Sequence, residues 1–75
     1  MNTRRVLQSD RDGPRFRIVR LYRVDAVTKA EVIGSADAPW EAMQRAFAEI
    51  GHVLAVDRRG EVYVDNHQLT QERPL

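Results

Sequence analysis

A single helical repeat lies between segments that alternate like β-strands, and this arrangement constrains the fold more than any other feature of the chain. From residue 40 onward, large apolar residues recur at spacings of three and four, which is the period of an α-helix. This stripe consists of Trp40, Met43, Phe47 and Ile50. Pro39 suits the first helical turn, Asp37 stands where a capping residue belongs, and Gly51 is of the type that ends helices. We therefore predict one helix from Pro39 to just before Gly51, with Trp40 and the rest of the stripe in the core.

Two β-strands are predicted before the helix. Residues 15–24 are rich in β-branched and aromatic side chains of alternating parity, which is typical of a long strand. Arg20 falls on the apolar parity. We therefore expect either a bulge near Val19 and Arg20 or an Arg20 side chain that reaches solvent along its stem. After a polar break at residues 25–28, residues 29–34 predict a second, shorter strand.

A β-hairpin is predicted after the helix. Asp57 suits the first position of a type I turn, and Gly60 suits the left-handed position of a three-residue hairpin loop. This turn sets Val56 opposite Val62 and Leu54 opposite Val64. The hairpin then has one apolar face, made of Leu54, Val56, Val62 and Val64.

These elements predict an α+β domain of ββαββ order, with an antiparallel four-stranded sheet in the strand order 2-1-3-4 and one helix packed on one face. The domain spans residues 15–65. Residues 1–14 form a basic flexible arm or a short edge strand, and residues 66–75 form a polar tail. Because one helix covers only one face, we expect the other face to lie bare. The predicted core consists of Phe16, Ile18, Val24, Val32, Trp40, Met43, Phe47, Ile50, Leu54, Val56, Val62 and Val64.

Catalytic and metal chemistry find little support in the sequence. There is no cysteine for a disulfide, a thiolate zinc site or a cysteine nucleophile, and the four glycines are dispersed at turns instead of forming a phosphate loop. The predicted hairpin register places His52 and His67 on opposite sides of the sheet, which argues against a metal pair. We therefore predict no enzyme, no catalytic or metal-binding residue, no cofactor and no small-molecule substrate.

The sequence contains no apolar stretch near the roughly 20 residues that a membrane span requires, and no secretory leader pattern. We expect a soluble cytoplasmic protein without a membrane partner.

Charge is distributed unevenly along the sequence. Residues 1–24 hold seven arginines and two acidic residues, whereas residues 25–75 hold five basic and nine acidic residues. Such a split is typical of a surface for an acidic partner, and equally of strands that pair with each other.

The sheet face opposite the helix is the predicted binding surface. It combines alternating arginines with apolar residues and a tyrosine, a mixture that is enriched at the centres of protein interfaces. The predicted partner-binding residues are Arg15, Arg17, Val19, Leu21, Arg23, Val53 and Tyr63. We predict a non-catalytic binding protein, a regulator or an inhibitor, that uses this face to engage a protein partner or a second copy of itself.

Nucleic-acid binding is the alternative prediction, because arginines in the first strand and in the preceding arm could contact phosphates. The residues that would do so are Arg4, Arg5, Arg11, Arg15, Arg17 and Arg23. The sequence pI of about 8.3 is lower than the value above 9 expected of a nucleic-acid-binding domain. An apolar centre on the same face favours a protein partner.

Four short strands and one helix in fewer than 80 residues resemble, in outline, several small phage-encoded inhibitors of bacterial defence complexes, including some anti-CRISPR proteins. The resemblance implies a role in binding and inhibiting a larger protein, and no motif of the chain carries it. A single lysine beside eleven arginines is typical of a GC-rich genome, which fits a bacterial or phage origin.

Overall fold

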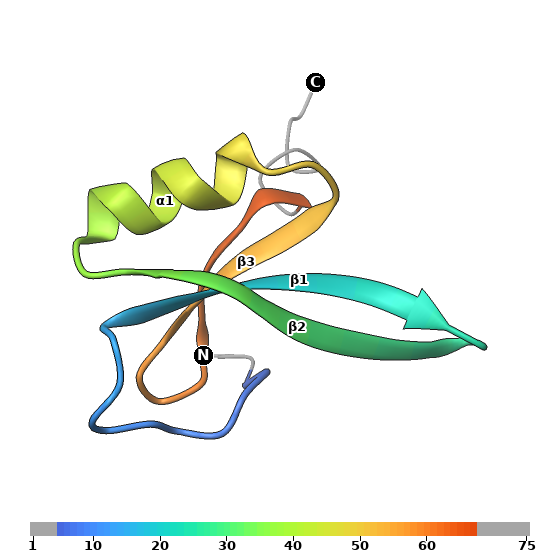
Figure 1. Cartoon of the computed structure of the whole chain (residues 1–75), viewed down its shortest axis with the longest axis horizontal. Helices are drawn as coiled ribbons and strands as arrows, with labels where there is room; N and C mark the ends of the chain where they lie inside the picture. Colours follow the sequence, from blue (N-terminus) through green and yellow to red (C-terminus); the bar gives the residue numbers. More distant parts are fainter. Residues whose placement is uncertain (1–4, 68–75) are drawn as a thin grey trace.

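The computed structural model describes residues 5–67 of the 75-residue chain. The elements are β1 (Phe16–Val24), β2 (Val27–Ala36), α1 (Pro39–Ala48), β3 (His52–Asp57) and β4 (Val62–Asp65). The strands form one antiparallel sheet in the order β2-β1-β3-β4, and α1 packs on one face of it (Figure 1). The predicted α+β fold, element order and strand order are therefore confirmed.

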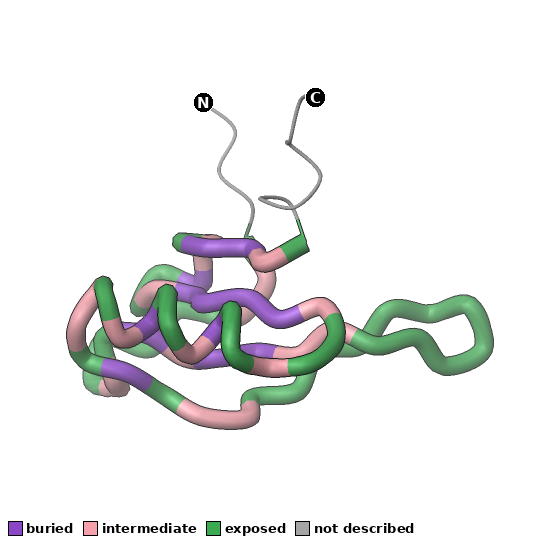
Figure 2. The backbone as a smooth tube through the Cα atoms, turned by 90° about the horizontal axis from the view of Figure 1, so that it is seen from above, coloured by how far each residue is buried: buried purple, intermediate pink, exposed green. Residues whose placement is uncertain are grey.

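The β1–β2 hairpin is longer than the sequence predicted. Its turn contains only Asp25 and Ala26, both at positive φ (51° and 68°), which is the geometry of a type I′ turn. The predicted polar break at residues 25–28 is therefore too long, because β2 begins at Val27. Since β3 pairs with β1 only as far as Leu21, the far part of this hairpin has two strands alone and projects from the body (Figure 2).

A bulge interrupts the ladder between β1 and β2, but the extra residue is in β2. Val19 pairs with Val32 and Ile18 pairs with Gly34, so Ile33 has no partner, while β1 pairs with β3 without a break. The bulge was expected in the first strand near Val19 and Arg20, and it is found in the neighbouring strand β2 at the same level of the ladder. Arg20 keeps its place on the helix side of β1.

Small residues of α1 face the sheet. Ala42 and Ala46 are the buried residues of the helix, and their methyl groups complete the core between helix and sheet. That core consists of Phe16, Ile18, Ala36, Ala42, Ala46, Val53, Ala55 and Val64, with Ile33 packed against it. The prediction that Trp40, Met43, Phe47 and Ile50 form the core face of the helix is wrong, because all four are exposed. Val24 and Val32, also predicted core residues, are exposed as well: Val24 lies on the projecting hairpin and Val32 on the edge strand β2.

The helix begins as predicted at Pro39, but not through the predicted cap. Its N-cap is Ala38, in an extended conformation without a side-chain hydrogen bond, so the capping role predicted for Asp37 is wrong. The helix ends at Ala48, two residues earlier than predicted, because its C-cap Glu49 is already extended. Gly51 has the expected positive φ of 96°, but it lies in the loop after the cap and does not itself end the helix.

A second core fills the opposite face of the sheet. Val19, Leu54 and Val56 are fully buried there, because the N-terminal segment lies over them. Val6 and Leu7 pack against these three residues, as do Leu21 and Val62. The prediction of a bare face is therefore wrong, since it left residues 5–13 without a place in the fold.

The β3–β4 turn holds this segment in position. Gly60 has a φ of 85°, as predicted, and its amide donates to the carbonyl oxygen of Asp57 at 2.9 Å. The amides of Val6 and Leu7 donate to the carbonyl oxygen of Gly60 at 2.7 and 3.3 Å. The amide of Asp10 donates to the carbonyl oxygen of Arg58 at 2.8 Å. The turn is thus both the end of the hairpin and the anchor of the N-terminal segment.

A further bulge lies at Tyr63 and changes the predicted register. Val56 pairs with Val62 as expected, but Ala55 pairs with Val64, which leaves Tyr63 as the extra residue. The bulge places Val64 on the other side of the sheet from Val62, whereas the prediction had both on one face. Val64 faces the helix as predicted, but Leu54, Val56 and Val62, also predicted to face it, belong to the second core.

Candidate functional site

The predicted partner-binding residues do not form one surface. Val19 and Val53 are fully buried, on opposite faces of the sheet, so the prediction that they meet a partner is wrong. Leu21 is half-buried beneath the N-terminal segment. Tyr63 is partly exposed, but its ring lies against Phe16 with the ring centroids 4.8 Å apart. The tyrosine thus closes the margin of the helix-side core.

The arginines of the first strand have separate surroundings. An Nη2 group of Arg17 donates to the carbonyl oxygen of Gln8 at 2.8 Å, which fastens the N-terminal segment to β1. The guanidinium of Arg15 lies over the ring of Phe16, 5.4 Å from its centroid. Arg23 is exposed on the projecting hairpin. Arg17 is thus engaged with the N-terminal segment and Arg15 precedes β1, so the three predicted partner-binding arginines do not form one exposed row along this strand.

The arginines of the N-terminal arm are likewise spread out. Arg5 forms an isolated antiparallel bridge with Glu61, beside the β3–β4 turn. Arg11 is exposed in the loop before β1, and Arg4 lies outside the described residues. These positions do not continue the line of Arg15 and Arg23, so the arm and the first strand give no single basic stripe within residues 5–67.

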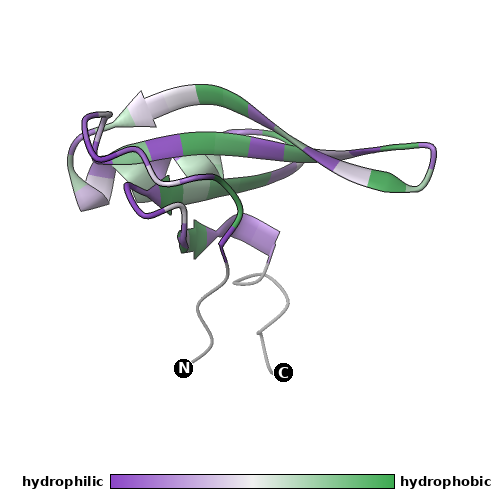
Figure 3. Cartoon of the chain, turned by 90° about the horizontal axis from the view of Figure 1, so that it is seen from below, coloured by the Kyte–Doolittle hydropathy of each residue, from purple (hydrophilic) through white to green (hydrophobic). Residues whose placement is uncertain are grey.

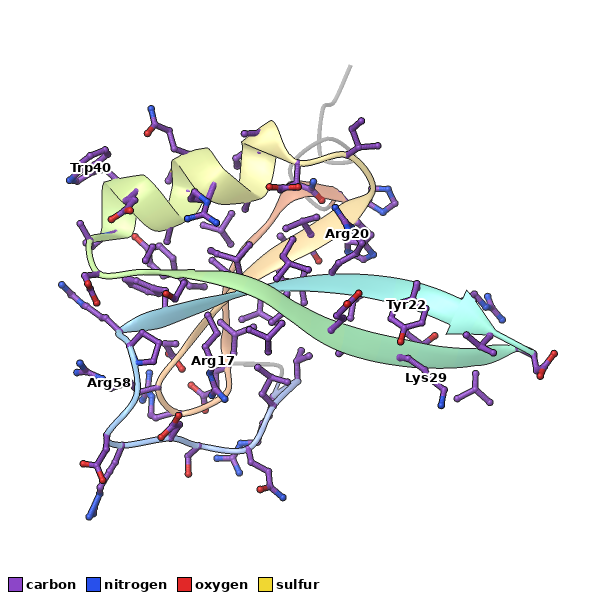
Figure 4. All side chains as sticks on the ribbon, in the orientation of Figure 1. Arg17, Arg20, Tyr22, Lys29, Trp40 and Arg58 are labelled. Carbon is purple, nitrogen blue, oxygen red and sulfur yellow. The ribbon has the colours of Figure 1, made fainter. Side chains whose placement is uncertain are left out.

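The large apolar side chains of α1, and Ile50 just after it, lie on a flank of the helix that the sheet does not cover. Trp40, Met43, Phe47 and Ile50 are 67%, 43%, 42% and 86% exposed. We call these four residues the outer helix stripe. Figure 4 labels Trp40 at the start of the helix, where its ring projects from the body. A shallow groove of about 500 Å³ runs along the stripe, lined by Trp40, Met43, Gln44, Phe47 and Ala48.

The spacing of small residues explains why the helix turned this way. At about 100° per residue, Ala42 and Ala46 define a narrow face whose direction lies roughly 100° from that of the outer helix stripe. Alanines let the helix axis approach the sheet closely, and the isoleucine and valines of the sheet already fill the core volume. The alanine pair at positions i and i+4 was the signal in the sequence for this alternative face.

Polar groups border the groove on one flank. Gln44 lines the groove and is exposed, and Glu41, one turn earlier on the helix, is half-buried. The one arginine of the helix turns elsewhere: an Nη1 group of Arg45 donates to the carbonyl oxygen of Ser35 at 3.2 Å, and the guanidinium covers Gly34. The stripe therefore has an acidic and uncharged polar border.

Two histidines come together at the end of the sheet, contrary to the prediction. The Nε2–H group of His52 donates to Oδ1 of Asp65 at 2.8 Å, and the rings of His52 and His67 stack with centroids 4.2 Å apart. The amide of His67 also donates to Oδ1 of Asp65, at 2.9 Å. The bulge at Tyr63 is the cause, because it moves Asp65 to the side of His52. Within residues 5–67 no group of three or more potential ligands is arranged to hold a metal ion.

An open groove of about 710 Å³ follows the projecting hairpin, on which Figure 3 shows apolar and polar residues alternating. Its charged lining comes from Arg5, Arg23 and Lys29, and Tyr22, Leu21 and Ala30 supply apolar walls. Figure 4 shows Tyr22 and Lys29 on the two neighbouring strands of this hairpin. The groove is wide and shallow, unlike the enclosed clefts that bury small molecules.

Searches against protein families, curated proteins and solved structures found no match to this chain. None of the helices in the described part of the chain has the length and apolar character to cross a membrane.

Proposed function

We propose that this protein is a non-catalytic binding module that docks on another protein through the outer helix stripe. The observation that supports this proposal is the inverted amphipathicity of α1, which buries alanines and exposes a tryptophan, a methionine and a phenylalanine, with a further exposed isoleucine just beyond its end. Soluble domains ordinarily bury such large apolar side chains in preference to alanine.

The exposed area is large enough to matter. At roughly 200 Å² for a fully exposed side chain of this size, the four exposed fractions correspond to about 480 Å². This is near the upper end of apolar patches on monomeric proteins, a range in which patches are often functional. It is about half of what one partner contributes to a standard interface, and the polar border would supply the rest.

The chemistry of the partner follows from the stripe and its border. Trp40, Met43 and Phe47 stand at helical spacing and fit the mode in which an amphipathic helix enters an apolar groove. Because Glu41 is on the same helix next to Trp40, the matching groove has basic side chains along its rim. We therefore infer a protein partner with an apolar, basic-rimmed groove. The cytoplasm is the compartment that we propose, since a chain without cysteine needs no oxidising environment.

Nucleic acid is the less favoured partner. Arg17 is engaged with Gln8, and Arg15 lies over Phe16, so fewer arginines are free for phosphates than the sequence suggested. An exposed apolar helix face also has no role in phosphate contact. Binding to duplex or single-stranded nucleic acid that weakens steeply with salt, and that Trp40→Ser leaves unchanged, would replace the present proposal.

Site-specific photo-crosslinking tests the proposal. A photoreactive residue at position 44, in the groove, is compared with one at position 59, on the exposed β3–β4 turn, in a lysate of the source organism. We expect position 44 alone to give an adduct with a distinct protein. Excess unlabelled parent protein should suppress this adduct at least tenfold more effectively than excess Trp40→Ser, since aromatic anchors dominate binding energy. Equal adducts at both positions, no adduct, or an adduct only with a second copy would overturn the proposal.

A further inference from the structure

The outer edge of β2 is long and unpaired within residues 5–67. The sheet order leaves β2 and β4 at its two edges; β4 spans only Val62–Asp65, whereas β2 spans Val27–Ala36. An extended edge of this length presents a row of free amide and carbonyl groups, which proteins commonly cover or interrupt. The bulge at Ile33 interrupts it only near its end.

Residues 27–29 of this edge belong to the projecting part of the hairpin, and residues 30–32 continue it along the three-stranded body up to the bulge. Residues 22–32 are all exposed, including Tyr22, Val24, Val27 and Val32. Beyond Leu21 this hairpin has no third strand, and an isolated two-stranded hairpin is marginally stable in water. A further strand against β2 would stabilise it.

The sequence of this edge is complementary to itself. When two copies of β2 run antiparallel about Ala30, Lys29 of each copy lies opposite Glu31 of the other. Thr28 then lies opposite Val32, so that β-branched residues face each other, and the regular pairing ends there because Ile33 is the bulged residue. The small Ala30 meets its own copy on the two-fold axis. Opposite charges and β-branched pairs at facing positions are what stabilises neighbouring antiparallel strands.

The direction of the backbone groups agrees with this pairing. The pair that closes a two-residue hairpin turn, here Val24 and Val27, shares hydrogen bonds, and the hydrogen-bonded positions then alternate along the strand. Val27, Lys29 and Glu31 accordingly turn their backbone groups toward β1. Thr28, Ala30 and Val32 turn theirs outward, and a two-fold axis at Ala30 sets these outward groups opposite one another.

Lys29 and Glu31, the charged residues of this pairing, are free to form ion pairs with a second copy. Among the described residues, neither Lys29 nor Glu31 forms an ion pair. Arg20, which faces Glu31 across the β1–β2 ladder, instead directs its Nη2 group to Glu49 Oε1 at 3.2 Å. A second copy would give both Lys29 and Glu31 an opposite charge at the facing position.

We propose that two copies of this chain associate through the outer edges of β2, antiparallel about Ala30, and form one continuous sheet. Such an interface is isologous, because the same residues of both copies meet across a two-fold axis. It uses a different surface from the outer helix stripe, so a dimer of this kind would present two copies of that stripe to partners. The inference therefore goes beyond the proposed function and does not depend on it.

Charge exchange across the edge gives a sharp test with the full-length chain. Lys29→Glu sets two carboxylates opposite each other at both facing positions of the dimer, and Glu31→Lys sets two ammonium groups opposite each other there. Each variant alone should associate at least about tenfold more weakly than the parent, since like charges at facing positions repel. In a mixed dimer of the two variants, each facing position pairs a carboxylate with an ammonium group, so the mixture should regain association like that of the parent. The double variant Lys29→Glu/Glu31→Lys restores an opposite charge at both facing positions and should associate like the parent.

Sedimentation velocity across a concentration series measures the parent, the single variants, their mixture and the double variant, and circular dichroism establishes that every variant is folded. Ile50→Ser, in the outer helix stripe, is the control and should leave association unchanged. Should the parent remain a monomer at several hundred micromolar, the proposal would be overturned. The same conclusion follows if the single variants dimerise like the parent, if the double variant fails to regain association, or if Ile50→Ser abolishes it.

Discussion

The carbonyl oxygen of Leu7 lies against the α-carbon of Gly60, at the place where any larger residue would carry its Cβ atom. Gly60 is also at a φ of 85°, a conformation that side chains disfavour. One glycine therefore serves two purposes, since it closes the β3–β4 turn and lets the N-terminal segment approach it.

Replacing Gly60 by valine should lower the free energy of unfolding by about 2–4 kcal/mol, because it adds backbone strain to a collision with the Leu7 carbonyl. Urea unfolding measures this. Arg58→Ala, which removes one exposed hydrogen bond to the carbonyl oxygen of Gly13, is the control and should cost about 1 kcal/mol or less. Trypsin should also cleave the Gly60→Val variant faster at Arg11, since the segment is released. Equal stabilities for the two variants would show that the turn tolerates a side chain.

Substitution in the buried face of α1 should destabilise the protein much more than substitution in the outer helix stripe. Ala46→Leu inserts a large side chain into a fully buried contact and should cost about 1–3 kcal/mol or more. Ile50→Ser alters a side chain that is 86% exposed and should change stability by about 0.5 kcal/mol or less. Thermal and urea unfolding of both variants give the comparison. A larger loss of stability from Ile50→Ser than from Ala46→Leu would indicate that the outer helix stripe belongs to the core, as the sequence had predicted.

The topology was predictable because its signals are local. Pro39 begins the helix and Gly60 closes the β3–β4 turn through their own backbone preferences, and the change of period from two to near 3.6 separates strand from helix. Which side of α1 packs on the sheet could not be predicted in this way. It depends on whether two alanines or four large residues meet the sheet, and that choice is made by the volume that β1, β2 and β3 already fill.

The predicted binding surface and the predicted positions of the histidines were wrong for a related reason. The run Val62-Tyr63-Val64 fits a regular strand as well as a bulged one, yet a bulge at Tyr63 reverses the side on which Val64 and Asp65 lie. Nothing in the run itself marks the extra residue. The burial of Val19 depends on Val6 and Leu7, an apolar pair in a polar segment, and only the geometry of the Gly60 turn brings that pair over the sheet.

The turn between β1 and β2 offers a stabilising substitution. Ala26 has a φ of 68°, which costs a residue with a side chain about 1–2 kcal/mol relative to glycine. Ala26→Gly removes this cost but gains flexibility in the unfolded chain, so the net gain should be about 0.5–1 kcal/mol. Hydrogen exchange of the β1 and β2 amides should slow accordingly. Thr28→Gly, in the extended part of β2, is the matched control and should accelerate exchange. Faster exchange in Ala26→Gly would contradict the type I′ geometry.

Asn66 joins the end of the sheet to the end of the helix. Its Oδ1 atom accepts from the amide of Val53 at 3.0 Å, and its Nδ2 group donates to the carbonyl oxygens of Ala46 and Gly51 at 3.2 and 3.0 Å. Val53 is fully buried, so its amide would lose its partner when the side chain is shortened. Asn66→Ala should therefore lower the free energy of unfolding by about 2–3 kcal/mol.

Asn66→Asp separates the two parts of this role, because a carboxylate can still accept from the Val53 amide but cannot donate to the carbonyls of Ala46 and Gly51. In addition, its negative charge would lie beside the C-terminal end of α1, where negative charge is unfavourable. At neutral pH the loss should therefore be at least as large as for Asn66→Ala. Below the pKa of the new carboxyl the neutral acid regains a donor, and the difference from the parent should shrink as the pH falls. Urea unfolding of the parent, Asn66→Ala and Asn66→Asp at pH 7 and pH 3 measures both effects. If the difference in stability between Asn66→Asp and the parent did not change with pH, the proposed hydrogen bonds of Asn66 to the end of the helix would be refuted.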